Sequence, residues 1–287
     1  MLYYYAFTGH KQGLDRVKKA SVILNKLRAK GINTMLLVND FRAGLVAREF
    51  GVPESVTIET IQDIDAIAVT GDCVIIDSPE DDHGRLVKYC SDFKKVFRFA
   101  QSNEDKSIHG ETMLHLNAED EQDISSIIVD DVYFEAKEKE QRTLFFLGDS
   151  DAEKTILSHA DFFKENPMEL LLGHYFYVKY EDDLAKIFET LHEAEEYIDL
   201  ICTSSKIVTA SFQTALEARV AGAEVVFIDL EQCSTEEKEL LNAINVSTIS
   251  SFDTKAYQQS TSKEPLEKCT QIKKSDSIVE QISLSLL

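Results

Sequence analysis

Short apolar runs alternate with amphipathic stretches along the first hundred residues of the chain. Apolar residues recur at helical spacing from Leu14 to Lys30, and Gly31 follows them, which predicts a helix that ends before this glycine. The apolar runs between such stretches predict strands at residues 2–7, 32–38, 56–61, 73–77 and 93–99. Because strands and helices alternate, we expect the first half to be α/β, with a parallel, doubly wound sheet.

The same alternation begins again near residue 143. We predict strands at residues 143–147, 168–172, 206–209, 224–230 and 246–249, and helices at 152–164, 184–194, 215–221 and 236–245. Residues 124–132 are expected to form a strand or an edge segment. The charged run EAKEKEQR at 135–142 predicts a linker, and its alternative is a solvated helix inside one domain.

This pattern predicts two α/β domains and a tail. The N-terminal domain is expected at residues 1–138, and the second domain at 139–255. Residues 256–287 are predicted to be a polar tail with a closing helix from residue 277, and residues 254–275 are either a mobile tail or a loop before that helix.

The charge of the chain argues against a general nucleic-acid binder. The net charge is −21, and a surface of that sign repels a phosphate backbone. Residues 1–50 differ from the rest of the chain, because they contain nine Lys or Arg and three Asp or Glu, which gives this segment a net charge of +6. This basic segment suits a small anionic ligand, although a solvated helix face is the alternative for its lysines.

The ends and the cysteines bear on localisation. No apolar run is long enough to span a membrane, and the N-terminus has no basic segment followed by an apolar core. The five cysteines show no CxxC spacing, so we predict free thiols in a cytoplasmic protein. The sequence lacks GxGxxG, GxxxxGK[ST], HExxH and GxSxG motifs, and we expect no cofactor.

Residues 203–230 contain a complete strand, turn, helix and strand with polar groups at the turn. In a parallel sheet, this turn lies at the carboxyl edge, where backbone N–H groups can receive phosphate oxygens. Ser211, Gln213 and Thr214 would line that edge, and Glu217 could reach the hydroxyls of a ribose or a sugar. The alternative is an ordinary βαβ unit with a solvated Glu217.

The turn after the first strand carries a histidine, in Thr8-Gly9-His10. An imidazole placed there could take a proton from water or a hydroxyl, or it could merely cap or bridge the loop. Arg16, near the first turn of the next helix, could approach an anion, and Gly9 would border the same site. Asp77 ends the strand at 73–77, where it either orients His10 or a water molecule, or serves as a helix cap or turn residue.

A second acidic turn follows the strand at 143–147. We count Gly148 and Asp149 of this turn among the substrate-binding residues. Asp149 and Asp151 could also hold a divalent ion, but an N-cap for the following helix explains the same residues, and we predict no metal site.

The residue 203–230 unit resembles the nucleotide-sugar-binding region of the GT-B superfamily. There, a small polar turn, a ribose-binding Glu, a short helix, a Gly and a strand recur in this order, and Glu217 matches the ribose-binding Glu. The family usually has Gly where this chain has Ser211. The resemblance implies two Rossmann-like domains with parallel sheets, with the ligand in the cleft between them.

Over most of the chain, the order of features is similar to that of the UDP-sugar hydrolases of pseudaminic acid biosynthesis. The shared features are the first turn with Gly-His and a following Arg, the strand that ends in Asp77, the strand-Gly-Asp near residue 148, and the turn before Glu217. The resemblance implies that His10 activates water, which displaces the nucleotide diphosphate at the anomeric carbon of a UDP-sugar. The family's tighter Gly-His-x-x-Arg spacing is absent, since KQGLD separates His10 from Arg16.

Two other functions remain open at this point. One is a GT-B glycosyltransferase that transfers the sugar to an acceptor. The other is a non-catalytic binding or assembly protein, which the missing glycines and the shifted Arg16 favour. The partner that we expect is a small-molecule nucleotide-sugar.

Overall fold

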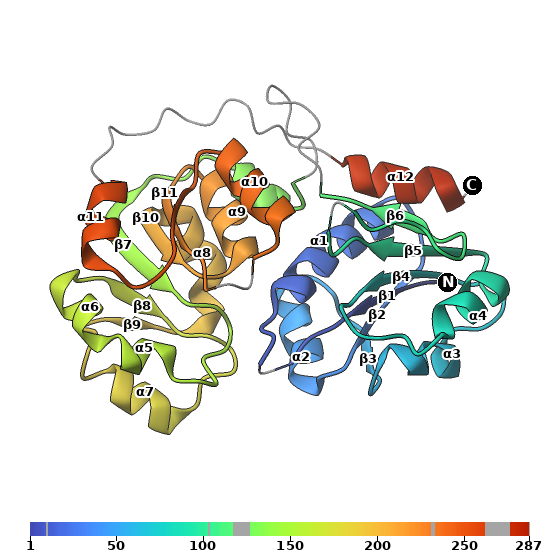
Figure 1. Ribbon diagram of the computed structural model, residues 1–287, viewed down its shortest axis with the longest axis horizontal. Helices are drawn as coiled ribbons and strands as arrows, with labels where there is room; N and C mark the ends of the chain where they lie inside the picture. Colours follow the sequence, from blue (N-terminus) through green and yellow to red (C-terminus); the bar gives the residue numbers. More distant parts are fainter. Residues whose placement is uncertain (10, 103, 117–126, 231–232, 262–275, 287) are drawn as a thin grey trace. The chain divides into compact units, whose positions relative to one another are not determined.

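The computed structural model describes residues 1–9, 11–102, 104–116, 127–230, 233–261 and 276–286. His10 and residues 262–275 of the predicted tail therefore lie outside the described residues. The chain forms two compact units, Met1–Asn117 with Ser275–Leu287, and Ala118–Lys274 (Figure 1). The boundary expected after residue 138 falls within the second unit.

The first unit is built around a six-stranded sheet with the order β3-β2-β1-β4-β5-β6. All of its strand pairs are parallel, as predicted for a doubly wound sheet. The strands are β1 (Leu2–Ala6), β2 (Thr34–Val38), β3 (Ser55–Thr57), β4 (Cys73–Asp77), β5 (Lys95–Phe99) and β6 (Thr112–Leu114).

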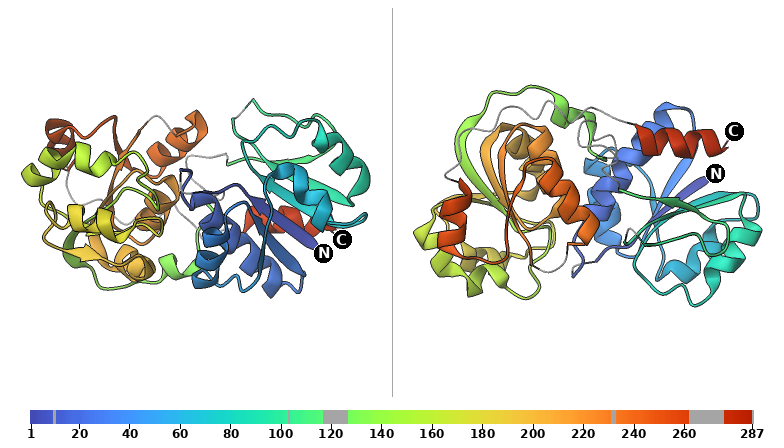
Figure 2. Two further views of the ribbon diagram at one scale, coloured as in Figure 1. Left: turned by 90° about the horizontal axis from the view of Figure 1, so that it is seen from below. Right: turned by 45° about the horizontal axis from the view of Figure 1, so that its top comes forward.

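Helices cover both faces of this sheet (Figures 1 and 2). The helical elements are α1 (Asp15–Ala29), α2 (Phe41–Glu49), η1 (Ile61–Asp63), α3 (Ile64–Ile67), α4 (Arg85–Asp92) and α12 (Ser277–Leu286). α1 contacts both α2 and α12. On the other face, Tyr5 of β1 and Ile76 of β4 pack with Ile64 of α3 and Tyr89 of α4.

The C-terminal helix belongs to the first unit, although its sequence follows the second. The Lys26 ammonium lies 2.5 Å from the Asp276 carboxylate, and the Lys94 ammonium donates to the Leu286 carbonyl at 2.8 Å. Ile278, Val279 and Ile282 are buried. The predicted closing helix therefore completes the fold of the first unit by covering α1 and β5.

The second unit repeats this architecture with the order β12-β11-β10-β7-β8-β9, again with every pair parallel. The strands are β7 (Glu140–Phe146), β8 (Glu169–Leu171), β9 (Leu191–His192), β10 (Ser204–Thr209), β11 (Glu224–Ile228) and β12 (Ser247–Ile249). The helical elements are η2 (Asp131–Phe134), α5 (Thr155–Ser158), α6 (Ala160–Glu165), α7 (Val178–Leu184), η3 (Ala194–Glu196), α8 (Tyr197–Thr203), α9 (Phe212–Val220), α10 (Thr235–Ala243) and α11 (Thr254–Thr261).

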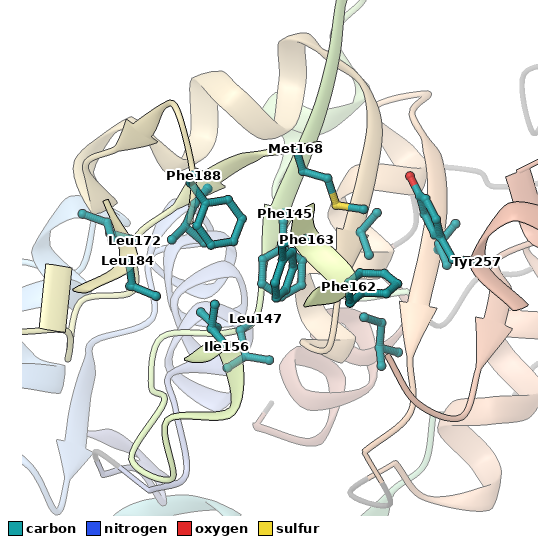
Figure 3. Packing of buried hydrophobic residues seen from close by; sticks show 14 of the residues in the cluster. Phe145, Leu147, Ile156, Phe162, Phe163, Met168, Leu172, Leu184, Phe188 and Tyr257 are labelled. Atoms are coloured by element: carbon teal, nitrogen blue, oxygen red, sulfur yellow. The ribbon is translucent and has the colours of Figure 1, made fainter. Parts of the chain in front are cut away.

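An aromatic core holds α6 against the second sheet (Figure 3). The ring of Phe163 lies 4.7 Å from that of Phe145 and 4.8 Å from that of Phe188. Tyr257 of α11 packs on Phe162 at 5.6 Å, so α11 is part of the same core. Burial of these large side chains stabilises the short α6, which has too few residues to be stable alone.

Several predicted elements are wrong in their type or extent. Residues 254–261, expected as part of a mobile tail or a loop, form the helix α11. The helix expected at 152–164 consists of two short helices, α5 and α6, which are separated at His159. The helix expected at 184–194 is absent, because α7 ends at Leu184 and the chain then enters β9. Residues 127–130, expected as a strand or edge, have no regular structure.

The charged run at 135–142 ends within the sheet rather than forming a linker throughout. Glu140 begins β7 and is in register with Ser204 of β10. Strand pairing therefore includes polar residues that the local sequence pattern predicts to form a linker.

Among the described residues, no helix has the length and apolar character that a membrane span requires.

Candidate functional site

The predicted site residues lie at one topological position in each sheet. The chain leaves β1 and β4 in opposite directions in the first unit, and β7 and β10 in opposite directions in the second. Ligands of open α/β sheets bind outside the carboxyl ends of strands at such switch points. The described residues that fall there are Gly9, Arg16 and Asp77 in the first unit, and Gly148, Asp149, Ser211, Gln213, Thr214 and Glu217 in the second.

Glycines shape the first turn of each unit. Gly9 has φ 152° and Gly148 has φ 147°, a region that L side chains rarely adopt. The Gly9 carbonyl accepts hydrogen bonds from the N–H groups of Gln12 at 2.8 Å and Gly13 at 2.9 Å. The sequence correctly places both glycines just beyond a strand.

Asp77 and Arg16 form an ion pair at the first switch point. The buried Asp77 carboxylate lies 3.4 Å from Arg16 Nε and 2.8 Å from Lys19 Nζ, and it accepts a hydrogen bond from Tyr4 Oη at 3.0 Å. These partners offset the desolvation of the carboxylate. Burial and the Asp77 charge raise the pKa of Tyr4 well above its ordinary value, so the phenol stays a donor.

Lys19 is a member of this cluster that sequence analysis missed. Its ammonium also lies 4.1 Å from the centre of the Phe99 ring, a cation–π contact. The sequence could have indicated this role, because Lys19 follows Arg16 by three residues and a helix places such residues on one face. The cluster of Arg16, Lys19 and Asp77 carries one net positive charge beside the Gly9–Gly13 turn.

At the second switch point, Ser211 is the N-cap of α9, and Thr214 lies in the first turn of this helix. The Ser211 hydroxyl accepts from the Thr214 N–H at 3.1 Å and lies 2.8 Å from the Thr214 hydroxyl, while the Ser211 N–H donates to Thr209 Oγ1 at 3.0 Å. This N-cap explains why the helix starts at Phe212, earlier than the predicted Ala215.

Glu217 is buried, so the alternative of a solvated Glu217 is wrong. Its Oε2 accepts from Tyr197 Oη at 2.6 Å, and its Oε1 accepts from Gln213 Nε2 at 2.9 Å. Gln213 Nε2 also donates to the Ile128 carbonyl at 2.9 Å, so the segment before η2 is bonded to α9. Burial and the Glu217 carboxylate raise the pKa of Tyr197 and of buried Tyr133 well above their ordinary values.

These hydrogen bonds compete with the predicted contact between Glu217 and a ribose. A ribose hydroxyl that reached Glu217 would meet a carboxylate that already accepts two hydrogen bonds from the protein. Gln213, predicted to bind substrate, holds Glu217 and Ile128 in this structure. Tyr197 was missed because it lies twenty residues from Glu217, and no local pattern indicates that pairing.

Asp149 forms a buried pair with His174, a third residue that sequence analysis missed. Nδ1 of His174 lies 2.7 Å from Asp149 Oδ1, and the two side chains are 8% and 0% exposed. The Tyr175 N–H donates to the Asp149 carbonyl at 3.0 Å. A Cβ on Gly173 would lie 2.6 Å from the carbonyl carbon of Asp149, so only glycine lets the two turns approach this closely.

Asp151 has the capping role that was the alternative to metal binding. Its carboxylate oxygens accept from the N–H groups of Thr155 at 2.6 Å and Ile156 at 3.0 Å, and from the Tyr180 hydroxyl. Within the described parts of the chain, no group of three or more His, Cys, Asp or Glu is arranged to hold a metal ion.

Comparison with known proteins identifies the fold. No family model and no curated protein matches the sequence. Among solved structures, a glycosyltransferase from Rickettsia africae ESF-5 is similar with a TM-score of 0.55 at 9% identity, covering 99% of this chain and 92% of that one. The UDP-GlcNAc 2-epimerase from Methanocaldococcus jannaschii has a TM-score of 0.54 at 12% identity and covers 99% of both chains.

A third similar structure is the UDP-GlcNAc 2-epimerase from Neisseria meningitidis bound to UDP-GlcNAc. Its TM-score is 0.50 at 11% identity, and the match covers 100% of this chain and 99% of that one. The predicted α/β fold with two Rossmann-like domains and parallel sheets, of GT-B type, is therefore confirmed. The low identities show the fold alone.

Proposed function

We propose that this chain is an enzyme that uses a nucleotide-activated sugar. The observation that carries the proposal is the gathering of the predicted polar residues at the switch points of two units whose fold is shared with nucleotide-sugar enzymes. Fold likeness alone does not determine chemistry, so the proposal depends on these residues as well.

The nucleotide is assigned to the second unit. The β7 and β10 turns bring Gly148 and the N-terminus of α9 to one edge, and a helix N-terminus favours phosphate groups. Glu217 is assigned to the ribose because it matches the ribose-binding Glu of the GT-B superfamily. In that role it would exchange a hydrogen bond of Tyr197 or Gln213 for one from the sugar hydroxyl.

The first choice of reaction is hydrolysis at the anomeric carbon. His10 takes a proton from water, the new C–O bond forms at this carbon, and the bond to the diphosphate breaks with its electron pair on the leaving oxygen. Asp77 contributes by fixing Arg16 and Lys19 next to the turn that carries His10.

Transfer to an acceptor is the second candidate. The similarity in fold to the glycosyltransferase from Rickettsia africae ESF-5 supports it. The attacking group would then be an acceptor hydroxyl in place of water.

The first experiment is a thermal-shift and calorimetric screen against UDP, GDP, CDP, CMP and several UDP-sugars, with and without magnesium. A ligand that binds the folded state raises the melting temperature, so we expect a preference for one nucleoside diphosphate. Release of free sugar from the matching nucleotide-sugar, lost in His10→Gln with nucleotide affinity retained, would support hydrolysis. No shift with any nucleotide at millimolar concentration would instead support a non-catalytic protein of another specificity.

A further inference from the structure

The phenol of Tyr133, in η2, lies next to the Glu217 carboxylate but is held less firmly than the other groups there. The side chain is 2% exposed, and burial and the charge of Glu217 raise its pKa well above the ordinary value. Among the described residues, none forms a hydrogen bond of ordinary geometry with the Tyr133 hydroxyl. A buried hydroxyl without such a bond costs free energy, so packing of the ring holds Tyr133 in this position.

A ribose that reaches Glu217 needs space in addition to the exchange of a hydrogen bond. Glu217 is 1% exposed, so a ligand can touch its carboxylate only after a covering group has moved. Movement of Tyr197 or of Gln213 would break two hydrogen bonds in each case. Of these three side chains beside Glu217, Tyr133 alone can leave without the loss of a hydrogen bond.

The place of Tyr133 in the chain allows this movement. η2 is a single turn of four residues, and residues 135–138 after it are exposed. The Asp130 carboxylate accepts a hydrogen bond from the Val132 N–H at 3.0 Å, so a contact independent of the Tyr133 side chain holds the backbone of the turn. Rotation of the side chain can therefore take the ring away from Glu217 while η2 stays in place.

We propose that Tyr133 is a gate over Glu217, whose phenol ring occupies the place of the ribose and turns away when a nucleotide binds. This inference rests on the proposed function, because it takes Glu217 as the ribose ligand. Exposure of the ring uses part of the binding free energy. The apparent affinity of the wild type is therefore lower than that of a form in which the gate is open.

The test is calorimetric titration of the full chain with UDP, GDP and CDP. Tyr133→Ala removes the ring, so we expect it to bind the nucleotide that the wild type prefers about tenfold more tightly, although it unfolds more easily. Tyr133→Phe keeps the ring and should bind that nucleotide like the wild type. A purely structural role of Tyr133 predicts equal or weaker binding by Tyr133→Ala, and this result would overturn the inference.

Tyr257→Ala is the matched control. Tyr257 is 8% exposed and packs on Phe162 in the aromatic core of the same unit. Its replacement should also lower stability, but it should leave nucleotide affinity unchanged. A similar gain of affinity in both alanine variants would show that loosening of the second unit is the cause, and the gate would be wrong.

A measurement on the wild type tests the gate without a destabilising substitution. Tetranitromethane nitrates accessible phenols, and mass spectrometry locates the modified residue. Tyr133 should stay unmodified in the free protein and become modified at saturating nucleotide, while Tyr177, which is 51% exposed, reacts in both states. Protection of Tyr133 in both states would contradict the movement. If Tyr133→Ala does not fold, this measurement decides alone.

The two proposals fail in different ways. If the wild type binds a nucleoside diphosphate and Tyr133→Ala binds it no better, this inference is wrong and the proposed function stands. A wild type that binds none of the three nucleotides would overturn both.

Discussion

Tyr197 of α8 donates a hydrogen bond to Glu217 of α9, with 2.6 Å between Oη and Oε2. Tyr197 Oη also lies 2.7 Å from the Thr214 hydroxyl, so one phenol links the predicted ribose ligand to the first turn of α9. Both Tyr197 and Glu217 are buried, where an unsatisfied polar group is costly. The carboxylate that the sequence suggests for a ligand is thus part of the internal support of the site.

Tyr197→Phe should lower the free energy of unfolding by about 1–3 kcal/mol, because it removes a donor from a buried carboxylate. Urea denaturation followed by circular dichroism measures this change. Tyr177→Phe is the control, since Tyr177 is 51% exposed, and it should change stability little. Equal stability of the Tyr197 variant and the wild type would show that Glu217 does not need this donor.

The ribose assignment of Glu217 predicts a selective effect on ligand binding. Glu217→Gln should weaken a ribonucleotide by about 1–3 kcal/mol and leave the matching deoxyribonucleotide unchanged, because only the former has the hydroxyl concerned. Calorimetric titration of both ligands against both proteins measures the coupling. If the variant weakens both nucleotides equally, Glu217 acts by holding Tyr197 and Gln213 instead.

Asp77→Asn should destabilise the first unit by about 1.5–3 kcal/mol, because it leaves Arg16 and Lys19 beside each other without their shared anion. Thermal or urea unfolding measures the loss. Asp92→Asn breaks a more exposed pair with Lys88 and should change stability little. Equal effects of the two substitutions would contradict the special role of the buried carboxylate.

Glu111 should make stability depend on acid pH. Burial acts to raise the pKa of its carboxyl, but hydrogen bonds from the His109 and Ile108 N–H groups and the charge of Arg98 lower it to about 2. Because the folded pKa lies below the ordinary 4.5, this stabilisation is present above pH 4.5 and is lost as the pH falls towards 2. Glu111→Gln should therefore be less stable than the wild type at pH 7.

The difference between the two proteins should shrink as the pH falls below 4.5. Urea denaturation at pH 7, 4.5 and 3 measures it. A difference that stays constant over this range would show that ionisation of Glu111 is not its source.

Gly173→Ala should separate the β7 and β8 turns, because the new methyl would overlap backbone atoms of Gly148 and Asp149. We expect a loss of about 1–3 kcal/mol in the free energy of unfolding. In Gly44→Ala, the methyl overlaps the Ser55 hydroxyl, which can rotate away, and no backbone atom, so that variant should lose less. A Gly173 variant as stable as Gly44→Ala would contradict the close approach of the two turns.

The fold class followed from the sequence because the alternation of apolar strands and helices is a local pattern. The predicted strand at 73–77 has the bounds of β4, and the predicted closing helix begins at Ser277 as α12 does. Gly9, Asp77 and Gly148 were placed at strand ends for the same reason, since a parallel sheet brings such ends to one edge.

Tertiary structure decided which side chains meet and where weak elements begin and end. Glu140 joins β7 because β10 provides a pairing partner, and α6 persists because Phe163 packs between Phe145 and Phe188. Contacts such as Asp149 with His174 join residues that no local period relates. Sequence by itself therefore determined the order of the elements and their carboxyl-edge polar residues. Pairing and burial between distant segments determined which of those residues bind one another, as Glu217 binds Tyr197.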